Sequence, residues 1–94
     1  MKTIYKYPVK VDDEQIIQMP DDSEILSIQY QYGRPYIWAM VDTDKPSIPR
    51  KFGLVGTGHP CERLNNAKYV GSFQMQNGAL IFHLFDFGAV GTTN

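Results

Sequence analysis

The chain has 94 residues, a formal net charge of −1 and a single cysteine, Cys61. This length allows one domain, and the near-neutral charge argues against broad binding to a nucleic-acid polymer, which needs a basic surface. A lone cysteine forms no disulfide within the chain, no apolar run approaches the roughly 20 residues that span a bilayer, and the first residues lack the apolar core of a signal peptide. We therefore expect a single β domain over residues 1–94, in the cytoplasm and with no membrane partner.

The elements predicted along the chain are strands. No window carries the apolar stripe of an amphipathic helix, and six prolines interrupt the sequence at short intervals. Runs with strand chemistry lie between them, at residues 2–7, 14–19, 24–32, 36–42, 50–57, 67–76 and 79–86. The pattern predicts an all-β fold, a small antiparallel sandwich or barrel of about six to seven strands with mostly meander connections. Residues 87–94 contain few apolar anchors, and we expect them to form a flexible tail.

Two hairpins are predicted by their turns. Residues 24–32 alternate apolar and polar side chains, and the short turn Gly33-Arg34 leads into residues 36–42. Asn77-Gly78 joins the last two strands, and Asn-Gly between apolar runs is a strong hairpin signal. Residues 36–42 are apolar on both faces, so we expect this strand to be central and covered on both sides, by the chain itself or by another subunit.

The segment Gly56-Thr57-Gly58-His59-Pro60 is the most unusual part of the sequence. Glycines on either side of Thr57 let the backbone bend, and the N–H groups of Thr57 and Gly58 could cradle an anion, with His59 adding a hydrogen bond. The segment lacks the Gly-Lys-Ser/Thr end of a Walker A loop, and no βαβ unit surrounds it. The alternative is a corner or bulge that ends a strand, with His59 in solvent.

Arginine and aromatic residues lie close together at two points on the chain. Arg34 precedes Tyr36 and Trp38, and Arg50 precedes Phe52. A ring beside a guanidinium can stack a base while the cation holds a phosphate. The alternative is that these cations are ordinary surface residues. The predicted ligand-binding residues are Arg34, Tyr36, Trp38, Arg50, Thr57, Gly58 and His59.

Glutamines recur in two of the predicted strands, and we expect them to share one sheet face. They are Gln29, Gln31, Gln74 and Gln76. Such a face beside tyrosine and tryptophan can hydrogen-bond a polar aromatic ligand such as a nucleobase, or it can be the wet side of a half-buried sheet.

No pattern predicts a metal site, a cofactor or a catalytic centre. His83 shares a strand face with Ile81 and Phe85, which is typical of a core or interface histidine. His59 and His83 alone are weak evidence for a metal, because no carboxylate motif adjoins them. Cys61 lies close to His59, but a Cys–His pair needs a third group that orients it. We expect a protein that is not an enzyme, and a phosphodiesterase using the two histidines is the enzymatic alternative.

Several segments, taken in order, resemble a family of short uncharacterised proteins encoded by bacteriophages and prophages. The likeness covers about residues 3–86, and it is most specific at EILSIQ, Ile37-Trp38-Ala39, GTGHP, and the GSFQ and ALIFHLF segments. The glycine- and threonine-containing tail after Asp86 departs from the family. The resemblance implies a viral, cytoplasmic, non-structural accessory protein, and it carries no activity that can be transferred residue by residue.

Small phage proteins of this kind often counter bacterial defence, and one strategy is to sequester nucleotide immune signals in pockets between subunits. Together with the Gly56–Pro60 segment and the excess of tyrosine, the resemblance favours a non-catalytic accessory protein that sequesters a nucleotide-derived immune signal. We also expect a homo-oligomer, because small β domains with apolar faces need covering. The alternatives are an inhibitor or adaptor of a host protein, and a minor virion component.

Overall fold

The computed structural model describes residues 1–90, which form an all-β fold with two antiparallel sheets. The strands are β1 (Lys2–Pro8), β2 (Glu14–Pro20), β3 (Glu24–Gln31), β4 (Arg34–Asp42), β5 (Ser47–Gly56), β6 (Lys68–Met75) and β7 (Leu80–Ala89). Two short 3-10 segments, η1 (Glu62–Leu64) and η2 (Gln76–Gly78), lie in the connections. Each predicted strand is present, with small shifts at its ends. No helix in these residues is long and apolar enough to cross a membrane.

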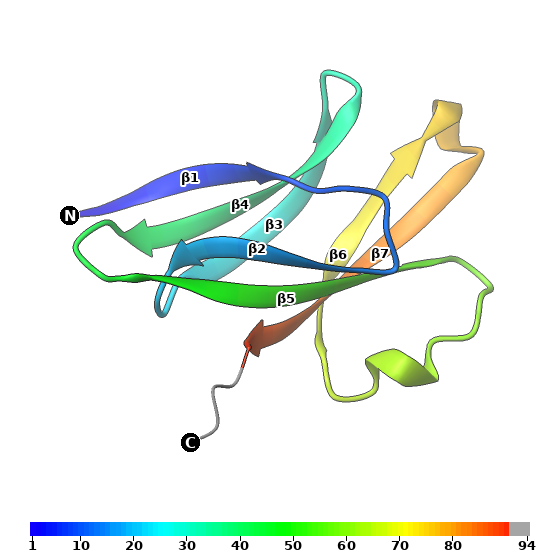
Figure 1. Ribbon diagram of the computed structural model, residues 1–94. Coiled ribbons are helices and arrows are strands. Elements are labelled where there is room, and N and C mark those ends of the chain that lie inside the picture. Colours follow the sequence, from blue (N-terminus) through cyan, green and yellow to red (C-terminus); the bar gives the residue numbers. More distant parts are fainter. Residues whose placement is uncertain (91–94) are drawn as a thin grey trace.

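The strands are divided between two sheets that pack face to face (Figure 1). Sheet A has the order β1-β4-β3, and sheet B has the order β2-β5-β7-β6. Consecutive strands pair only in the hairpins β3–β4 and β6–β7, while the connections after β1, β2 and β4 carry the chain from one sheet to the other. The predicted all-β sandwich is therefore confirmed, and meander connections are limited to these two hairpins.

The core lies between the inner faces of the two sheets. Side chains alternate across a strand, so Ile37, Ala39 and Val41 of β4 all point toward sheet B, and each is at most 1% exposed. Phe52 of β5 and Leu84 of β7 face them and are fully buried. At one side of the sandwich β3 also packs on β6, where the rings of Tyr30 and Phe73 stack with centroids 6.3 Å apart.

The two predicted hairpins are present. In the first, the turn residues are Tyr32 and Gly33, both with positive φ (52° and 82°), and Arg34 already begins β4. A two-residue turn of this kind requires positive φ at both positions, so the turn lies one residue earlier than predicted. In the second, Asn77 and Gly78 lie within the connection between Met75 and Leu80, as expected.

The strand β4 is central, as predicted, but the chain covers only one of its faces. Its inner face is buried against sheet B, whereas on the outer face Tyr36 and Trp38 are half-buried and Met40 is 37% exposed. In residues 1–90 no third layer folds over this side of sheet A. The chain itself therefore covers one face of this strand, and cover of the other face by another subunit stays a prediction.

The strand β7 extends into the segment that was expected to be a tail. The Nζ atom of Lys51 lies 4.6 Å from the centre of the Phe87 ring, and the N–H of Gly88 donates to Asp86 Oδ1 at 2.8 Å. The N–H of Val90 donates to the carbonyl of Pro49 at 3.0 Å. These contacts hold residues 87–90 against β5, so the expectation of a tail is wrong for them. The rest of that segment, residues 91–94, lies outside the described residues.

A salt bridge ties the β2–β3 turn to the β4–β5 turn, with Lys45 Nζ 2.9 Å from Asp22 Oδ2. The hydrogen bond and charge of Lys45 lower the pKa of the Asp22 carboxyl, and Asp22 raises the pKa of Lys45 in return. Because the folded-state pKa of Asp22 is the lower one, this pair stabilises the fold above the unfolded-state pKa. The contribution is lost as the pH falls through the folded-state pKa.

We expect Lys45→Met to raise the pKa of Asp22 toward its ordinary value, because the substitution removes both the hydrogen bond and the charge. An NMR titration that follows the side-chain carboxyl carbon of Asp22 measures this shift directly. Lys10→Met, which removes a charge from the β1–β2 loop, serves as the control and should leave the titration unchanged. An Asp22 pKa that is the same in wild type and Lys45→Met contradicts the prediction.

Candidate functional site

The structure distributes the predicted ligand-binding residues over three places. The first is the outer face of sheet A, the second is the loop after β5, and the third is the part-buried contact between the β2–β3 turn and β7. The outer face of sheet A carries Arg34, Tyr36 and Trp38. The loop after β5 carries Thr57, Gly58 and His59, and the third place holds Arg50. No single pocket brings the three groups together in residues 1–90.

The side chain of Arg50 is engaged inside the protein. Its Nε and Nη2 atoms donate to the Asp86 carboxylate at 3.1 and 2.7 Å, and Nη1 donates to the carbonyl of Ser23. The Asp86 side chain is 8% exposed and that of Arg50 is 16% exposed. Two parallel N–H···O bonds to one carboxylate are a strong and directional arrangement. Arg50 therefore holds the β2–β3 turn to β7, and the arrangement leaves its guanidinium poorly placed for a ligand.

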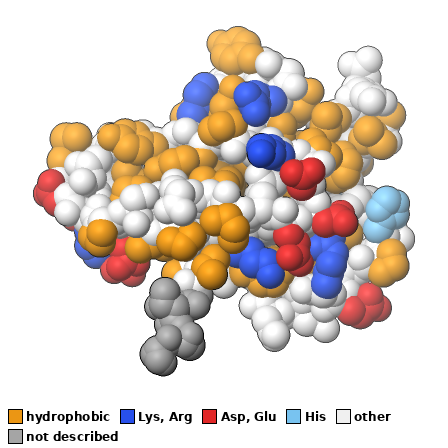
Figure 2. Space-filling model, viewed as in Figure 1, with side chains coloured by type: hydrophobic (Ala, Val, Ile, Leu, Met, Phe, Trp, Pro, Cys, Tyr) orange, Lys and Arg blue, Asp and Glu red, His pale blue; other side chains and the backbone are white. Residues whose placement is uncertain are grey.

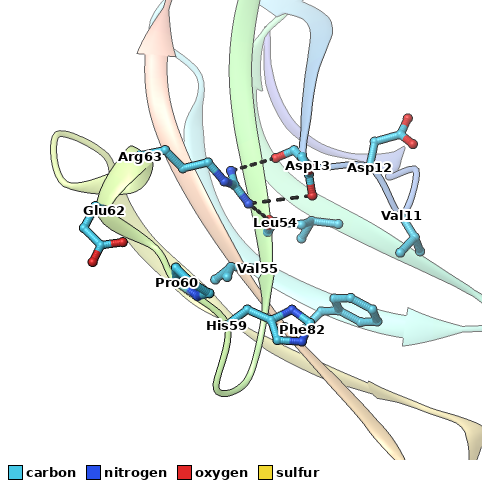
Figure 3. A pocket seen from close by; sticks show the side chains of 11 residues that line it. Val11, Asp12, Asp13, Leu54, Val55, His59, Pro60, Glu62, Arg63 and Phe82 are labelled. Carbon is cyan, nitrogen blue, oxygen red and sulfur yellow. Dashed lines mark hydrogen bonds and ion pairs between the residues drawn. The ribbon is translucent and has the colours of Figure 1, made fainter.

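A hollow of about 590 Å³ lies beside the Gly56–Pro60 segment (Figure 3). Its walls are the end of β5, the β1–β2 loop, the loop after β5 and one side chain of β7. The lining residues are Val11, Asp12, Asp13, Leu54, Val55, Gly56, His59, Pro60, Glu62, Arg63 and Phe82.

The charges around this hollow do not favour an anion. Three carboxylates line it, and the guanidinium of Arg63 donates to the carbonyls of Asp13 and Leu54, with the Asp13 carboxylate 3.8 Å away. Figure 3 shows the guanidinium of Arg63 directed toward Asp13 and Leu54. Acidic and basic side chains also mix over the right-hand side of the molecule in Figure 2. A phosphate in this hollow would meet several carboxylates and one cation that is already engaged.

The Gly56–Pro60 segment forms a corner that ends β5. The N–H of Thr57 donates to the carbonyl of Ile81 at 3.0 Å, and the N–H of His59 donates to the carbonyl of Gly56 at 3.1 Å. Gly58 has φ +87°, a conformation that side chains rarely adopt, which explains the glycine at this position. The N–H of Thr57 that was predicted to hold an anion is therefore used in a hydrogen bond to β7. These contacts are typical of a corner that ends a strand, which is the alternative interpretation of this segment.

His83 lies on the outer face of sheet B, between two hydrogen-bonding partners. Its Nε2 lies 2.7 Å from Thr57 Oγ1, and its Nδ1 lies 2.8 Å from the hydroxyl of Tyr69. The three side chains come from β6, β7 and the start of the loop after β5, so only the pairing of these strands brings them together. Both ring nitrogens have partners, and residues 1–90 contain no group of three or more His, Cys, Asp or Glu side chains suited to a metal ion.

The outer face of sheet A gathers rings, cations and amides in one place. Lys6 on β1 lies directly opposite Trp38 on β4, and directly opposite residues project from the same face. The Nζ atom of Lys6 is 4.5 Å from the centre of the Tyr36 ring, 5.6 Å from that of Trp38 and 6.0 Å from that of Tyr32. The guanidinium carbon of Arg34 is 5.9 Å from the Tyr36 ring.

We call this surface the aromatic face. It consists of Lys6, Gln31, Tyr32, Arg34, Tyr36 and Trp38. Lys6 reaches across β4 to β3, where it donates to Gln31 Oε1 at 3.0 Å. A shallow hollow of about 320 Å³ adjoins Trp38 and is lined by Ser27, Gln29, Tyr30 and Gln31 as well. Its volume lies at the lower end of the range of about 300–1,000 Å³ that is usual for small-molecule sites.

Sequence reasoning found part of this surface and missed the rest. It identified Arg34, Tyr36 and Trp38, which lie within one strand, but not Lys6. The alternation of residues 2–7 was a usable signal for which side chains of β1 share a face, yet the pairing of β1 with β4 was not predictable from it. The four glutamines do not share a face, because Gln29 and Gln31 belong to sheet A, Gln74 to sheet B and Gln76 to a turn.

These observations define a small two-sheet β-sandwich whose central strand β4 exposes an aromatic and cationic face. The chain belongs to the family described as a domain of unknown function (DUF7352), which matches residues 1–90. No curated protein and no solved structure matches the chain.

Proposed function

We propose that this protein is a non-catalytic binding protein that holds a nucleotide-type ligand on the aromatic face. The observation that carries the proposal is the position of Lys6, whose ammonium lies over the rings of Tyr36 and Trp38 and bonds to Gln31. A cation, stacking rings and an amide thus lie within one surface. Rings of this kind stack on nucleic-acid bases, and cations of this kind hold phosphates.

The chemistry of each group suggests how such a ligand lies. The base stacks on Trp38 at the hollow of about 320 Å³, where the amides of Gln29 and Gln31 reach its polar edge. Lys6 and Arg34 hold the phosphate on the side of Tyr36, where both cations lie.

The biological setting of this proposal rests on the sequence resemblance. We infer that the ligand is a nucleotide-derived immune signal and that the protein is a phage accessory protein acting in counter-defence. The uncovered outer face of sheet A also supports a homo-oligomer, since a second copy could cover the shallow hollow beside Trp38.

Binding can be followed through Trp38, the only tryptophan in the chain. We expect one or more of AMP, cyclic dinucleotides, cyclic trinucleotides and cyclic ADP-ribose variants to quench its fluorescence and to release or absorb heat on mixing. Trp38→Ala should weaken the binding measured by calorimetry by about 1–3 kcal/mol, the usual contribution of a stacked base.

Two variants control this experiment. Trp38→Phe retains a ring and should keep most of the affinity, whereas Tyr69→Phe alters a ring on sheet B and should leave binding unchanged. No heat with any of these nucleotides at millimolar concentration contradicts the proposal. An affinity that Trp38→Ala leaves intact places the ligand elsewhere on the protein.

A second candidate function is binding to a host protein, and exposed apolar side chains on the same sheet favour it. Ile4 and Met40 lie directly opposite each other on β1 and β4 and are 52% and 37% exposed. In addition, β1 is an edge strand of sheet A, and such an edge can add a strand from a partner. A host protein that co-purifies from infected cells at a fixed stoichiometry, and is lost on Ile4→Glu, would favour this function over nucleotide binding.

A further inference from the structure

We infer that Lys6 determines which ligands the aromatic face accepts, and that it selects flat rings that carry an anionic group over neutral rings. This inference rests on the proposed function and adds the chemical class of the ligand. It makes Lys6 a specificity-determining residue, in contact with the ligand.

Lys6 covers the surfaces that a base needs. Its ammonium lies 4.5 Å from the centre of the Tyr36 ring and 5.6 Å from that of Trp38, and both distances are within the range of a cation–π interaction. Its hydrogen bond to Gln31 fixes it there at 3.0 Å. A ligand ring that stacks on this face must therefore move the ammonium aside.

The charge of Lys6 has no carboxylate partner among residues 1–90. Two other lysines do have one, because Lys45 pairs with Asp22 and Lys51 pairs with Glu14, whereas Lys2, Lys10 and Lys68 form no such pair within residues 1–90 either. The partners of Lys6 are two ring faces at short range and a neutral amide. An ammonium held only by neutral groups gains most when an anion arrives, because a charge-assisted hydrogen bond is stronger than the neutral ones it replaces.

Neutral rings and rings that carry an anionic group therefore differ in the free energy needed to displace the ammonium of Lys6. A neutral ring removes the cation–π contacts and the bond to Gln31 and offers the ammonium nothing in return. A ring with a phosphate gives the ammonium a new partner while the ring takes its place on Trp38. Lysine suits this exchange, since its ammonium has three donors at the end of a flexible stem.

The test compares AMP with adenosine as probes, on the full chain, by Trp38 fluorescence and calorimetry. We expect wild type to bind AMP at least about tenfold more tightly than adenosine, as a hydrogen bond to a charged group predicts. In Lys6→Met, which keeps the apolar stem, AMP should bind about tenfold more weakly. Adenosine should bind about twofold to fivefold more tightly, because the rings are no longer covered.

Two control variants make the outcome specific to Lys6. Lys6→Arg keeps the charge and should keep the preference for AMP. Lys2→Met removes a charge from the same strand and the same face, opposite Asp42, and should change neither affinity by more than about twofold. The unfolding transition of each variant, measured in urea, shows whether the fold is retained.

The outcomes separate this inference from the proposed function. If Lys6→Met weakens AMP and adenosine equally, or leaves the binding of AMP unchanged, the inference is wrong and nucleotide binding on this face still stands. If neither probe binds to wild type or to Lys6→Met, both are wrong for this ligand class. Tighter adenosine binding together with weaker AMP binding in Lys6→Met is the result that supports the inference.

Discussion

Replacing Asp86 with asparagine is expected to lower the free energy of unfolding by about 3–5 kcal/mol, the usual cost of removing one partner of a buried ion pair. The carboxylate of Asp86 accepts two hydrogen bonds from Arg50 and one from the N–H of Gly88. Asparagine has nearly the same shape but no charge, and its NH₂ group cannot accept a hydrogen bond. Arg50 would stay largely buried with its charge uncompensated.

Urea unfolding followed by circular dichroism measures this loss. Glu14→Gln breaks the exposed pair with Lys51 and should cost no more than about 1 kcal/mol, which makes it the matched surface control. The double variant Arg50→Met with Asp86→Leu replaces both charges by apolar side chains and should recover much of the stability. A loss below about 1 kcal/mol in Asp86→Asn contradicts the assignment of a structural role to this pair.

The Arg50–Asp86 pair also shows what the sequence could not predict about Arg50, one of the candidate ligand residues. The two residues are 36 positions apart in the chain, and nothing near either of them indicates that they meet. Arg50 next to Phe52 indicates a cation beside a ring, but in β5 both side chains point into the sandwich, because residues two apart share a strand face. Which face of a strand is buried depends on the other sheet, and that information is not local.

Local patterns did predict the strands and the two hairpins, because period-two alternation and turn chemistry depend only on neighbouring residues. The order of strands within each sheet depends on contacts between distant segments. For this reason the sequence alone did not place Lys6 in the candidate site. Its place opposite Trp38 follows from the pairing of β1 with β4, two strands that are separated in the chain by the whole of β2 and β3.

A second large effect is expected where the loop after β5 folds over sheet B. Leu64 of η1 is 2% exposed, and its Cδ2 lies 2.6 Å from the position that a Cβ would occupy on Gly53. The leucine thus packs into the space that the missing side chain leaves, and a glycine inside a strand is typical of such a close approach. The contact anchors the loop that carries Arg63, one wall of the hollow in Figure 3.

We expect Leu64→Ala to lower the free energy of unfolding by about 2–5 kcal/mol, because it removes a buried side chain and leaves a cavity. Gly53→Ala should cost about 1–3 kcal/mol, because the new methyl group overlaps the position of Leu64. In the double variant the methyl group fills part of the space left by the leucine. The double variant should therefore be more stable than the sum of the single changes predicts, by roughly 0.5–3 kcal/mol.

Urea unfolding of wild type, both single variants and the double variant measures this coupling as a double-mutant cycle. Amide hydrogen exchange adds a local readout, since Leu64→Ala should speed exchange in the loop after β5 more than in sheet A. Val90→Ala changes an exposed apolar residue outside this contact and should show no such coupling with Gly53→Ala. If the effects of Gly53→Ala and Leu64→Ala simply add, the packing of Leu64 on Gly53 does not anchor the loop.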